Sequence, residues 1–243
     1  MNRECIFSLF NGLYRWCFPL YRVLYFSYKR VSDRDKIGLI TGHVKPGMTV
    51  LDIGANIGFY TTLLSRCVGK NGTVYAFEPE EANFYHLKRL TKKLTNIKRV
   101  KAACGEKSGV AALYKSEDLY VDHHLYKNDE SREKIDVRMV SVDDYLKSEC
   151  GGIGFAKIDV QGYDCFVVKG MKETFSRSDN TIIIGELWPY GLRQAGSSAN
   201  EYLSELRRLG FIVEILSKDN PKDFSSHAED RSFYCDFIAR RPV

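Results

Sequence analysis

The sequence predicts an α/β fold with a doubly wound, mainly parallel sheet that carries helices on both faces. From Thr49 onward, segments of strand character alternate with segments of helical character. The first strand, 49–53, runs into a glycine-containing turn and then a helix, as in sheets that hold a nucleotide-like ligand. The last two strands follow each other without a helix between them. They add an antiparallel C-terminal strand pair to the sheet.

The composition limits the classes of protein to which this chain can belong. A chain of 243 residues with 44% hydrophobic and 28% charged residues can bury the core of one α/β domain. The net charge of +5 is too small to indicate nucleic-acid binding. The seven cysteines form no C-x-x-C pair and are odd in number, which predicts reduced thiols in a cytoplasmic protein. We find neither a stretch of about 18 apolar residues that could span a bilayer nor a signal peptide.

Residues 1–46 form a separate aromatic and basic helical segment, ahead of a main domain at 47–243. Residues 1–36 contain seven basic and three acidic residues. Pro19 should break or bend the segment, and 33–43 should form a short helix. Two interpretations stay open. Residues 1–30 could contact an anionic membrane surface, or the segment could pack on the domain as a lid with its arginines snorkelling to water.

The main domain begins with three strands and two helices, followed by a β insert. The first helix stops at Gly69, before the turn at Asn71-Gly72. After the third strand, strands and helices no longer alternate, and two antiparallel strands flank a polar loop. The expected strands are 49–53, 73–77, 98–104, 109–114 and 134–140, and the expected helices are 59–68 and 81–94.

The second half of the domain returns to alternation. Ser141 caps one short helix, and Ser197 or Ser198 caps the last one. Gly170 interrupts the helix between them. The expected helices are 142–148, 163–175 and 197–209, and the expected strands are 155–160, 181–187, 211–216 and 233–240.

The turn after the first strand indicates which ligand the fold takes. The pattern is D-x-G-x-x-x-G from Asp52 to Gly58, not the G-x-G-x-x-G that a dinucleotide pyrophosphate needs. Glu78 ends the next strand, where a carboxylate can accept hydrogen bonds from two ribose hydroxyls. The sequence therefore predicts an adenosine-type ligand without a pyrophosphate. S-adenosylmethionine fits, with its ribose at Glu78 and its amino-acid end at the turn and Asp52.

Other cofactor contacts follow from position along the chain. Ala103 and Cys104 end the third strand and offer a small apolar slot for the adenine. Tyr60 and Thr61 follow the turn and should help to close the site. The expected cofactor-binding residues are Asp52, Gly54, Asn56, Gly58, Tyr60, Thr61, Glu78, Ala103 and Cys104.

Two stretches resemble known motifs. Residues 50–58 (VLDIGANIG) with 76–79 (AFEP) resemble class I, Rossmann-like S-adenosylmethionine-dependent methyltransferases. Residues 155–164 (FAKIDVQGYD), followed by 168–170 (VKG), resemble the signature of the FkbM family. That family usually has Glu where Gln161 and Asp164 stand. The resemblance runs from about Asp33 to the C-terminal strands and implies methyl transfer to a hydroxyl, commonly of a sugar or a polyketide.

The catalytic candidates lie at the carboxyl ends of strands and in the insert. Asp159 and Glu186 are embedded in apolar runs, which is unusual for carboxylates without a partner or a function. Lys157 points to the same strand face as Asp159, so an ion pair is the alternative for Asp159. His123 of Asp122-His123-His124 is the first choice of base. Similar Asp-His pairs occur in the insert of FkbM-like sequences.

The prediction is an O-methyltransferase that uses S-adenosylmethionine, without a metal, on a sugar hydroxyl of a glycan, glycolipid or similar natural product. Trp188 and Tyr190 could line the acceptor pocket. A metal held by His123, Asp159 and Glu186 is neither supported nor excluded by their spacing. Two other classes stay open: a non-catalytic S-adenosylmethionine-binding module, suggested by Gln161, and another Rossmann-like transferase or oxidoreductase with an adenosine cofactor.

Overall fold

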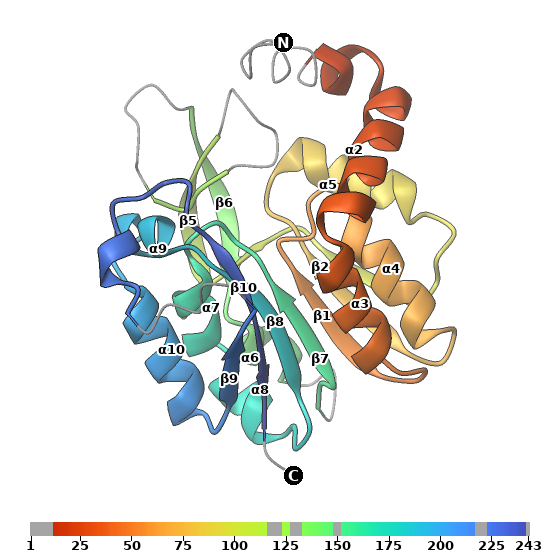
Figure 1. Cartoon of the computed structure of the whole chain (residues 1–243). Coiled ribbons are helices and arrows are strands. Elements are labelled where there is room, and N and C mark those ends of the chain that lie inside the picture. The colour runs from red at the N-terminus through yellow and green to blue at the C-terminus, as the bar shows by residue number, and fades with distance from the viewer. Residues whose placement is uncertain (1–11, 116–122, 127–132, 148–151, 217–222, 242–243) are drawn as a thin grey trace.

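The fold is built on a seven-stranded sheet (Figure 1). The structure is a computed structural model and describes residues 12–115, 123–126, 133–147, 152–216 and 223–241. β10 is antiparallel to both of its neighbours, whereas the pairs from β3 to β8 are parallel, so the predicted doubly wound sheet is confirmed. In spatial order the strands are β3 (Ile97–Val100), β2 (Thr73–Phe77), β1 (Thr49–Ile53), β7 (Phe155–Ile158), β8 (Ile182–Leu187), β10 (Cys235–Arg240) and β9 (Ile212–Ile215).

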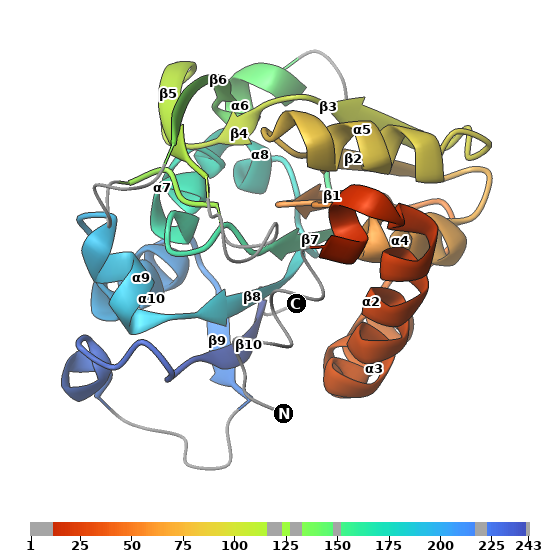
Figure 2. The ribbon, with the colours of Figure 1, turned by 90° about the horizontal axis from the view of Figure 1, so that it is seen from above.

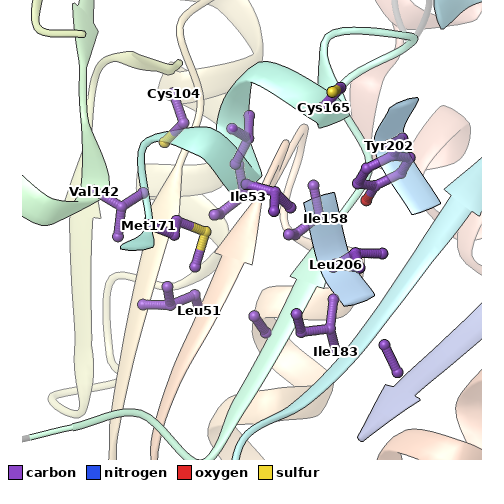
Figure 3. Close-up of a cluster of buried hydrophobic side chains, with 14 of the residues drawn as sticks. Leu51, Ile53, Cys104, Val142, Ile158, Cys165, Met171, Ile183, Tyr202 and Leu206 are labelled. Atoms are coloured by element: carbon purple, nitrogen blue, oxygen red, sulfur yellow. The ribbon is translucent and has the colours of Figure 1, made fainter. Parts of the chain in front are cut away.

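Helices cover both faces of the sheet (Figure 2). Because side chains alternate along β1, Val50 packs under the helices of one face, and Leu51 and Ile53 pack under those of the other. Figure 3 shows the second cluster, where Ile53 and Ile158 meet side chains of α10. The first face carries α3 (Arg34–His43), α4 (Phe59–Val68) and α5 (Glu81–Leu90), with α2 (Phe18–Ser32) outside them. The second carries α6 (Val142–Leu146), α7 (Asp164–Lys169), α8 (Lys172–Ser176), α9 (Pro189–Gln194) and α10 (Ala199–Arg208), near the 3-10 turn η1 (Ser225–His227).

The β insert is a separate three-stranded sheet. Its order is β4 (Ala103–Cys104), β6 (Lys134–Val140) and β5 (Gly109–Tyr114). The prediction of one strand over 98–104 is therefore wrong. The chain turns at the fully buried Ala102, whose N–H bonds the Val100 carbonyl at 3.0 Å. Pairing with β6 carries Ala103 and Cys104 out of the main sheet.

The remaining helices agree with the prediction at one point and differ from it at two. The predicted interruption at Gly170 is confirmed, because α7 ends at Lys169 and α8 begins at Lys172, and a Cβ at Gly170 would lie 2.1 Å from the Gly105 carbonyl oxygen. The break near Pro19 falls at Cys17, and Pro19 occupies the first turn of α2, where its missing N–H is tolerated. α9 was not predicted. Within the described part of the chain, we find no helix with the length and apolar character to cross a membrane.

Candidate active site

The turn after β1 is tied to the end of β2. The N–H groups of Gly54 and Ala55 both donate to the Phe77 carbonyl, and the N–H of Asn56 donates to Glu78 Oε2 at 2.8 Å. Gly54 has φ of +78°, in the left-handed region that favours glycine. Its missing Cβ also matters, because a Cβ there would lie 2.0 Å from the Asp159 carbonyl oxygen. The glycine thus lets the ends of β1 and β7 meet.

Glu78 is a buried carboxylate that helps to hold this turn. Its Oε1 accepts from the N–H of Glu80 at 3.0 Å, and its Oε2 accepts from Asn56. Each oxygen has two lone pairs, so both can still accept a ligand hydroxyl. Burial raises the pKa of Glu78 to about 7, against the opposing effect of the two N–H groups.

Lys157 lies beneath the turn as a buried cation. Its Nζ donates to the Gly54 carbonyl at 2.7 Å and lies 3.5 Å from Asp52 Oδ1 and 3.7 Å from Asp159 Oδ2. The ion pair considered as the alternative for Asp159 is therefore present. Lys157 connects the turn after β1 to the carboxylate after β7.

Asp52, Gly58 and Thr61 are not brought to the cavity wall. Asp52 is fully buried, because it lies one residue before the end of the central strand β1, between Ala76 and Lys157 of the neighbouring strands. It accepts a 2.5 Å hydrogen bond from Thr61 Oγ1. Asp52 thus lies between Thr61 and Lys157, and neither Asp52 nor Thr61 lines the cavity in which a ligand contact was expected for them.

Asp159 is held by a strained turn. Its Oδ1 accepts from Gln161 Nε2 at 3.0 Å, and Gln161 itself has φ of +54°. Asp164 secures the turn by accepting from the N–H groups of Val160 and Gly162 at 3.2 and 3.0 Å. The two residues at which the chain departs from the usual FkbM pattern thus orient Asp159 and its loop.

The pKa values of the two candidate carboxyls, Asp159 and Glu186, are shifted in opposite directions. Burial opposes ionisation of Asp159, but the cations of Lys157, Lys36 and Lys29 outweigh it and hold its pKa below the usual range. Burial, and then the charge of Asp159, raise the pKa of Glu186 to about 8. At neutral pH, Asp159 is a carboxylate and Glu186 retains its proton. Such divergence is typical of sites that divide acid and base roles.

One cavity of about 570 Å³ joins these elements. It contains Asp159 and Glu186 together with the third catalytic candidate, His123. Six of the nine expected cofactor residues line it: Gly54, Asn56, Tyr60, Glu78, Ala103 and Cys104. Within the described residues, no group of three or more His, Cys, Asp and Glu side chains is arranged to hold a metal ion.

His123 reaches the cavity because its neighbour is anchored. His124 is 1% exposed, and its backbone pairs with Tyr114 of β5 through hydrogen bonds of 2.8 and 3.1 Å. Its ring packs against Trp188. Successive side chains of extended backbone point to opposite sides, so His123 faces the cavity. Asp122, the acid expected to orient it, lies outside the described residues.

The N-terminal helix supplies a wall that the sequence analysis did not assign to the site. Tyr21, Tyr25, Tyr28 and Lys29 of α2 line the cavity. Their spacing of four, three and one residues puts them on one helix face, which is a signal present in the sequence. Asp33 secures this wall, because it pairs with Lys29 at 2.7 Å and accepts a hydrogen bond from the Tyr60 hydroxyl.

Trp188 and Tyr190 do not line the cavity. Trp188 Nε1 donates to the Arg231 carbonyl at 3.1 Å, and the Arg231 guanidinium lies 5.0 Å from the centre of the Tyr190 ring. The aromatic character expected of an acceptor pocket comes from the tyrosines of α2 instead.

The residues present fit S-adenosylmethionine. The volume falls within the range of small-molecule sites, roughly 300–1,000 Å³. Glu78 presents acceptor oxygens suited to a ribose, and Ala103 and Cys104 line an apolar part of the wall. The absent Cβ of Gly54 leaves the turn backbone open to the ligand.

The protonated state of Glu186 gives a pH-dependent prediction. Its folded pKa of about 8 exceeds the unfolded value of about 4.5, so its contribution to stability is full at low pH and is lost as pH rises through 8. Glu186→Gln should therefore match the wild type at pH 4.5 and exceed its free energy of unfolding by a few kcal/mol at pH 9, in urea titrations. Glu173→Gln, at an exposed position of α8, is the control. Equal stability of wild type and Glu186→Gln at pH 9 would contradict the assignment.

Comparison with known proteins shows to which family this chain belongs. The model of the methyltransferase FkbM domain matches residues 52–213. No curated protein matches the sequence. The match spans both the turn after β1 and the loop that carries Asp159.

Solved structures share the fold at low sequence identity. A Streptococcus mutans protein described as a methyltransferase, in complex with SAH, has 11% identity and a TM-score of 0.54, over 86% of this chain and 97% of that chain. An rRNA methylase from Streptococcus thermophilus has 12% identity and a TM-score of 0.50, over 86% and 95%. Aeropyrum pernix fibrillarin with natively bound S-adenosyl-L-methionine has 13% identity and a TM-score of 0.50, over 85% and 74%. With this fold and the match over residues 52–213, the chain belongs to the FkbM family of S-adenosylmethionine-dependent methyltransferases.

Proposed function

We propose that this methyltransferase transfers its methyl group to a hydroxyl of a sugar in a glycan, glycolipid or similar natural product. One observation carries the proposal: a single cavity joins the turn after β1 to a wall of tyrosines and carboxyls. Aromatic faces suit the apolar side of a sugar ring, and carboxylates accept hydrogen bonds from its hydroxyls. The small net charge favours such an acceptor over a nucleic acid.

The cofactor half of the site would bind and orient S-adenosylmethionine. Glu78 would accept hydrogen bonds from the ribose hydroxyls, while the turn at Gly54 and Asn56 would hold the amino-acid end. Ala103 and Cys104 would border the adenine. S-adenosylmethionine supplies a methyl group already activated by its sulfonium, so the protein mainly has to align the acceptor, which lowers the barrier by about 7–11 kcal/mol in favourable cases.

The acceptor half of the site would orient the acceptor hydroxyl and remove its proton. The Asp159 carboxylate accepts a hydrogen bond from the acceptor hydroxyl and orients it, and Gln161 and Lys157 keep that carboxylate in place. His123 takes the proton as the hydroxyl oxygen becomes nucleophilic, a role worth about 10²–10⁴-fold in rate. Glu186 keeps its own proton at neutral pH and can donate a hydrogen bond to a neighbouring oxygen.

Two measurements test this function. Calorimetry with S-adenosylmethionine, its demethylated product and NAD should give heat with the first two only. Mass spectrometry of glycans and lipids from cells with and without the gene should show the loss of one methyl mass. Binding of S-adenosylmethionine without any methylated product would favour the non-catalytic binding module, and heat with NAD alone would favour an oxidoreductase.

Glu78→Gln should weaken S-adenosylmethionine binding by about 10–100-fold, because a hydrogen bond to a charged group contributes about 1.5–3 kcal/mol. Affinity in the wild type should also fall below pH 7, where the carboxyl takes up a proton and can no longer accept both ribose hydroxyls. Calorimetry at pH 6 and pH 8 measures both effects. Glu81→Gln removes an exposed carboxylate three residues away and is the matched control. Unchanged affinity in Glu78→Gln would remove Glu78 from the cofactor site.

A further inference from the structure

The outer face of α2 carries apolar side chains where water would be expected. We call this the α2 outer face: Leu20, Val23, Leu24 and Val31, which are 46%, 54%, 40% and 80% exposed. On α10 every exposed position is polar, namely Asn200, Glu201, Ser204, Arg207 and Arg208. A surface helix normally turns polar side chains to solvent, so the α2 outer face is built for contact with a partner.

The two sides of α2 are both apolar, and the protein covers one of them. Tyr21 packs with Ile57 and lines the cavity together with Tyr25. The residues of the α2 outer face are spaced by three, one and seven positions, which places them together on a side of the helix that adjoins Tyr28 of the cavity wall. Figures 1 and 2 show α2 on the outside of the molecule, next to α3.

The charge of the segment identifies the partner. α2 contains three cations, Arg22, Lys29 and Arg30, and no Asp or Glu, and Lys29 pairs with Asp33 just beyond the helix. In an interface between two copies of this helix, Arg22 and Arg30 would meet without carboxylates of α2 to pair with. An anionic lipid surface neutralises them and accepts the apolar side chains between the headgroups. Trp16 and Tyr28, both exposed, are residue types enriched at the membrane interface.

We propose that the α2 outer face docks on a bilayer that contains anionic lipids, with α2 lying in the plane of the interface. Tyr28 is 63% exposed and also lines the cavity, so docking brings the cavity mouth to the headgroups. If the proposed function holds, this geometry admits an acceptor that remains anchored in the lipid. The docking itself does not depend on the reaction.

The test uses the full chain and vesicles, without any substrate. The protein should float with vesicles of phosphatidylcholine mixed with phosphatidylglycerol, bind pure phosphatidylcholine far more weakly, and detach as salt is raised. Leu20→Gln/Val23→Gln/Val31→Gln should lower the partition coefficient by about tenfold or more. Val110→Gln/Ile212→Gln removes exposed apolar side chains from β5 and β9 and should leave binding unchanged.

A second pair of variants tests the charge. Arg22→Gln/Arg30→Gln should lower binding to anionic vesicles by about fivefold for each cation. Lys88→Gln/Lys92→Gln removes the same charge from exposed positions of α5 and the turn after it, and should have little effect. No flotation with anionic vesicles, or equal losses in test and control variants, would overturn the proposal. A dimer that forms without lipid would also overturn the proposal, if analytical ultracentrifugation shows that it dissociates in the variant Leu20→Gln/Val23→Gln/Val31→Gln. Circular dichroism and S-adenosylmethionine calorimetry verify that each variant is folded.

Discussion

His123→Gln is expected to lower kcat by about 10²–10⁴-fold and to leave the affinity for S-adenosylmethionine unchanged. The imidazole is the base proposed to remove the acceptor proton, and it lies in the same cavity as Asp159. Glutamine retains a polar side chain but cannot take up the proton. The measurements are initial rates with a methylated-product readout and calorimetry of the cofactor.

The pH dependence of the rate separates His123 from Glu186. With His123 as the base, the wild-type rate should rise with pH as the imidazole loses its proton and should then level off. The rise should vanish in His123→Gln and persist in Glu186→Gln. A rate that instead rises through pH 8, and loses that rise in Glu186→Gln, would transfer the role of base to Glu186, whose pKa is about 8.

Among substitutions that add a single methyl group, Gly54→Ala is expected to disrupt the site most. The new Cβ would lie 2.0 Å from the Asp159 carbonyl oxygen and would occupy a backbone conformation with φ of +78°. The ends of β1 and β7 must then separate, which displaces Lys157 from its 2.7 Å contact with the Gly54 carbonyl. We expect a loss of several kcal/mol in the free energy of unfolding and at least about tenfold weaker S-adenosylmethionine binding.

Gly47→Ala is the matched control for this variant. Gly47 has φ of +85°, close to that of Gly54, but no atom lies within 4 Å of its ideal Cβ position. Its alanine variant should lose only the cost of the left-handed conformation, about 1–2 kcal/mol, and bind the cofactor normally. Urea titrations and calorimetry on both variants separate backbone strain from the contact with Asp159. Equal losses in the two variants would mean that the approach of β7 to the turn is unimportant.

That the turn after β1 and the end of β2 meet was predictable from the sequence, because both signals are local. The turn from Asp52 to Gly58 and the strand end at Glu78 are short patterns, and the structure joins them by the hydrogen bond from Asn56 to Glu78. The bounds of α4 and of β1, β2, β5 and β6 are as the sequence predicted. The wall that α2 contributes to the cavity was less predictable, because Tyr25 and Lys29 lie far along the chain from Asp159.

Asp52 shows where a sequence pattern is insufficient. Its motif position predicts a ligand contact, yet two neighbouring strands and Thr61 bury it completely. Burial depends on which strands flank β1, and no residue near Asp52 encodes that order. The same holds for Lys157, whose contacts with Asp52 and the Gly54 carbonyl need the pairing of β1 with β7.

The sequence by itself determined the alternation of strands and helices, the break from a dinucleotide pattern and the preference for S-adenosylmethionine. These properties arise from side-chain periodicity and turn chemistry within a few residues. Only the tertiary structure decided that β10 lies between β8 and β9, that Ala103 and Cys104 leave the main sheet, and that α2 forms one wall of the cavity. Each depends on contacts between segments far apart in the chain, where hydrogen-bond pairing and apolar burial compete globally.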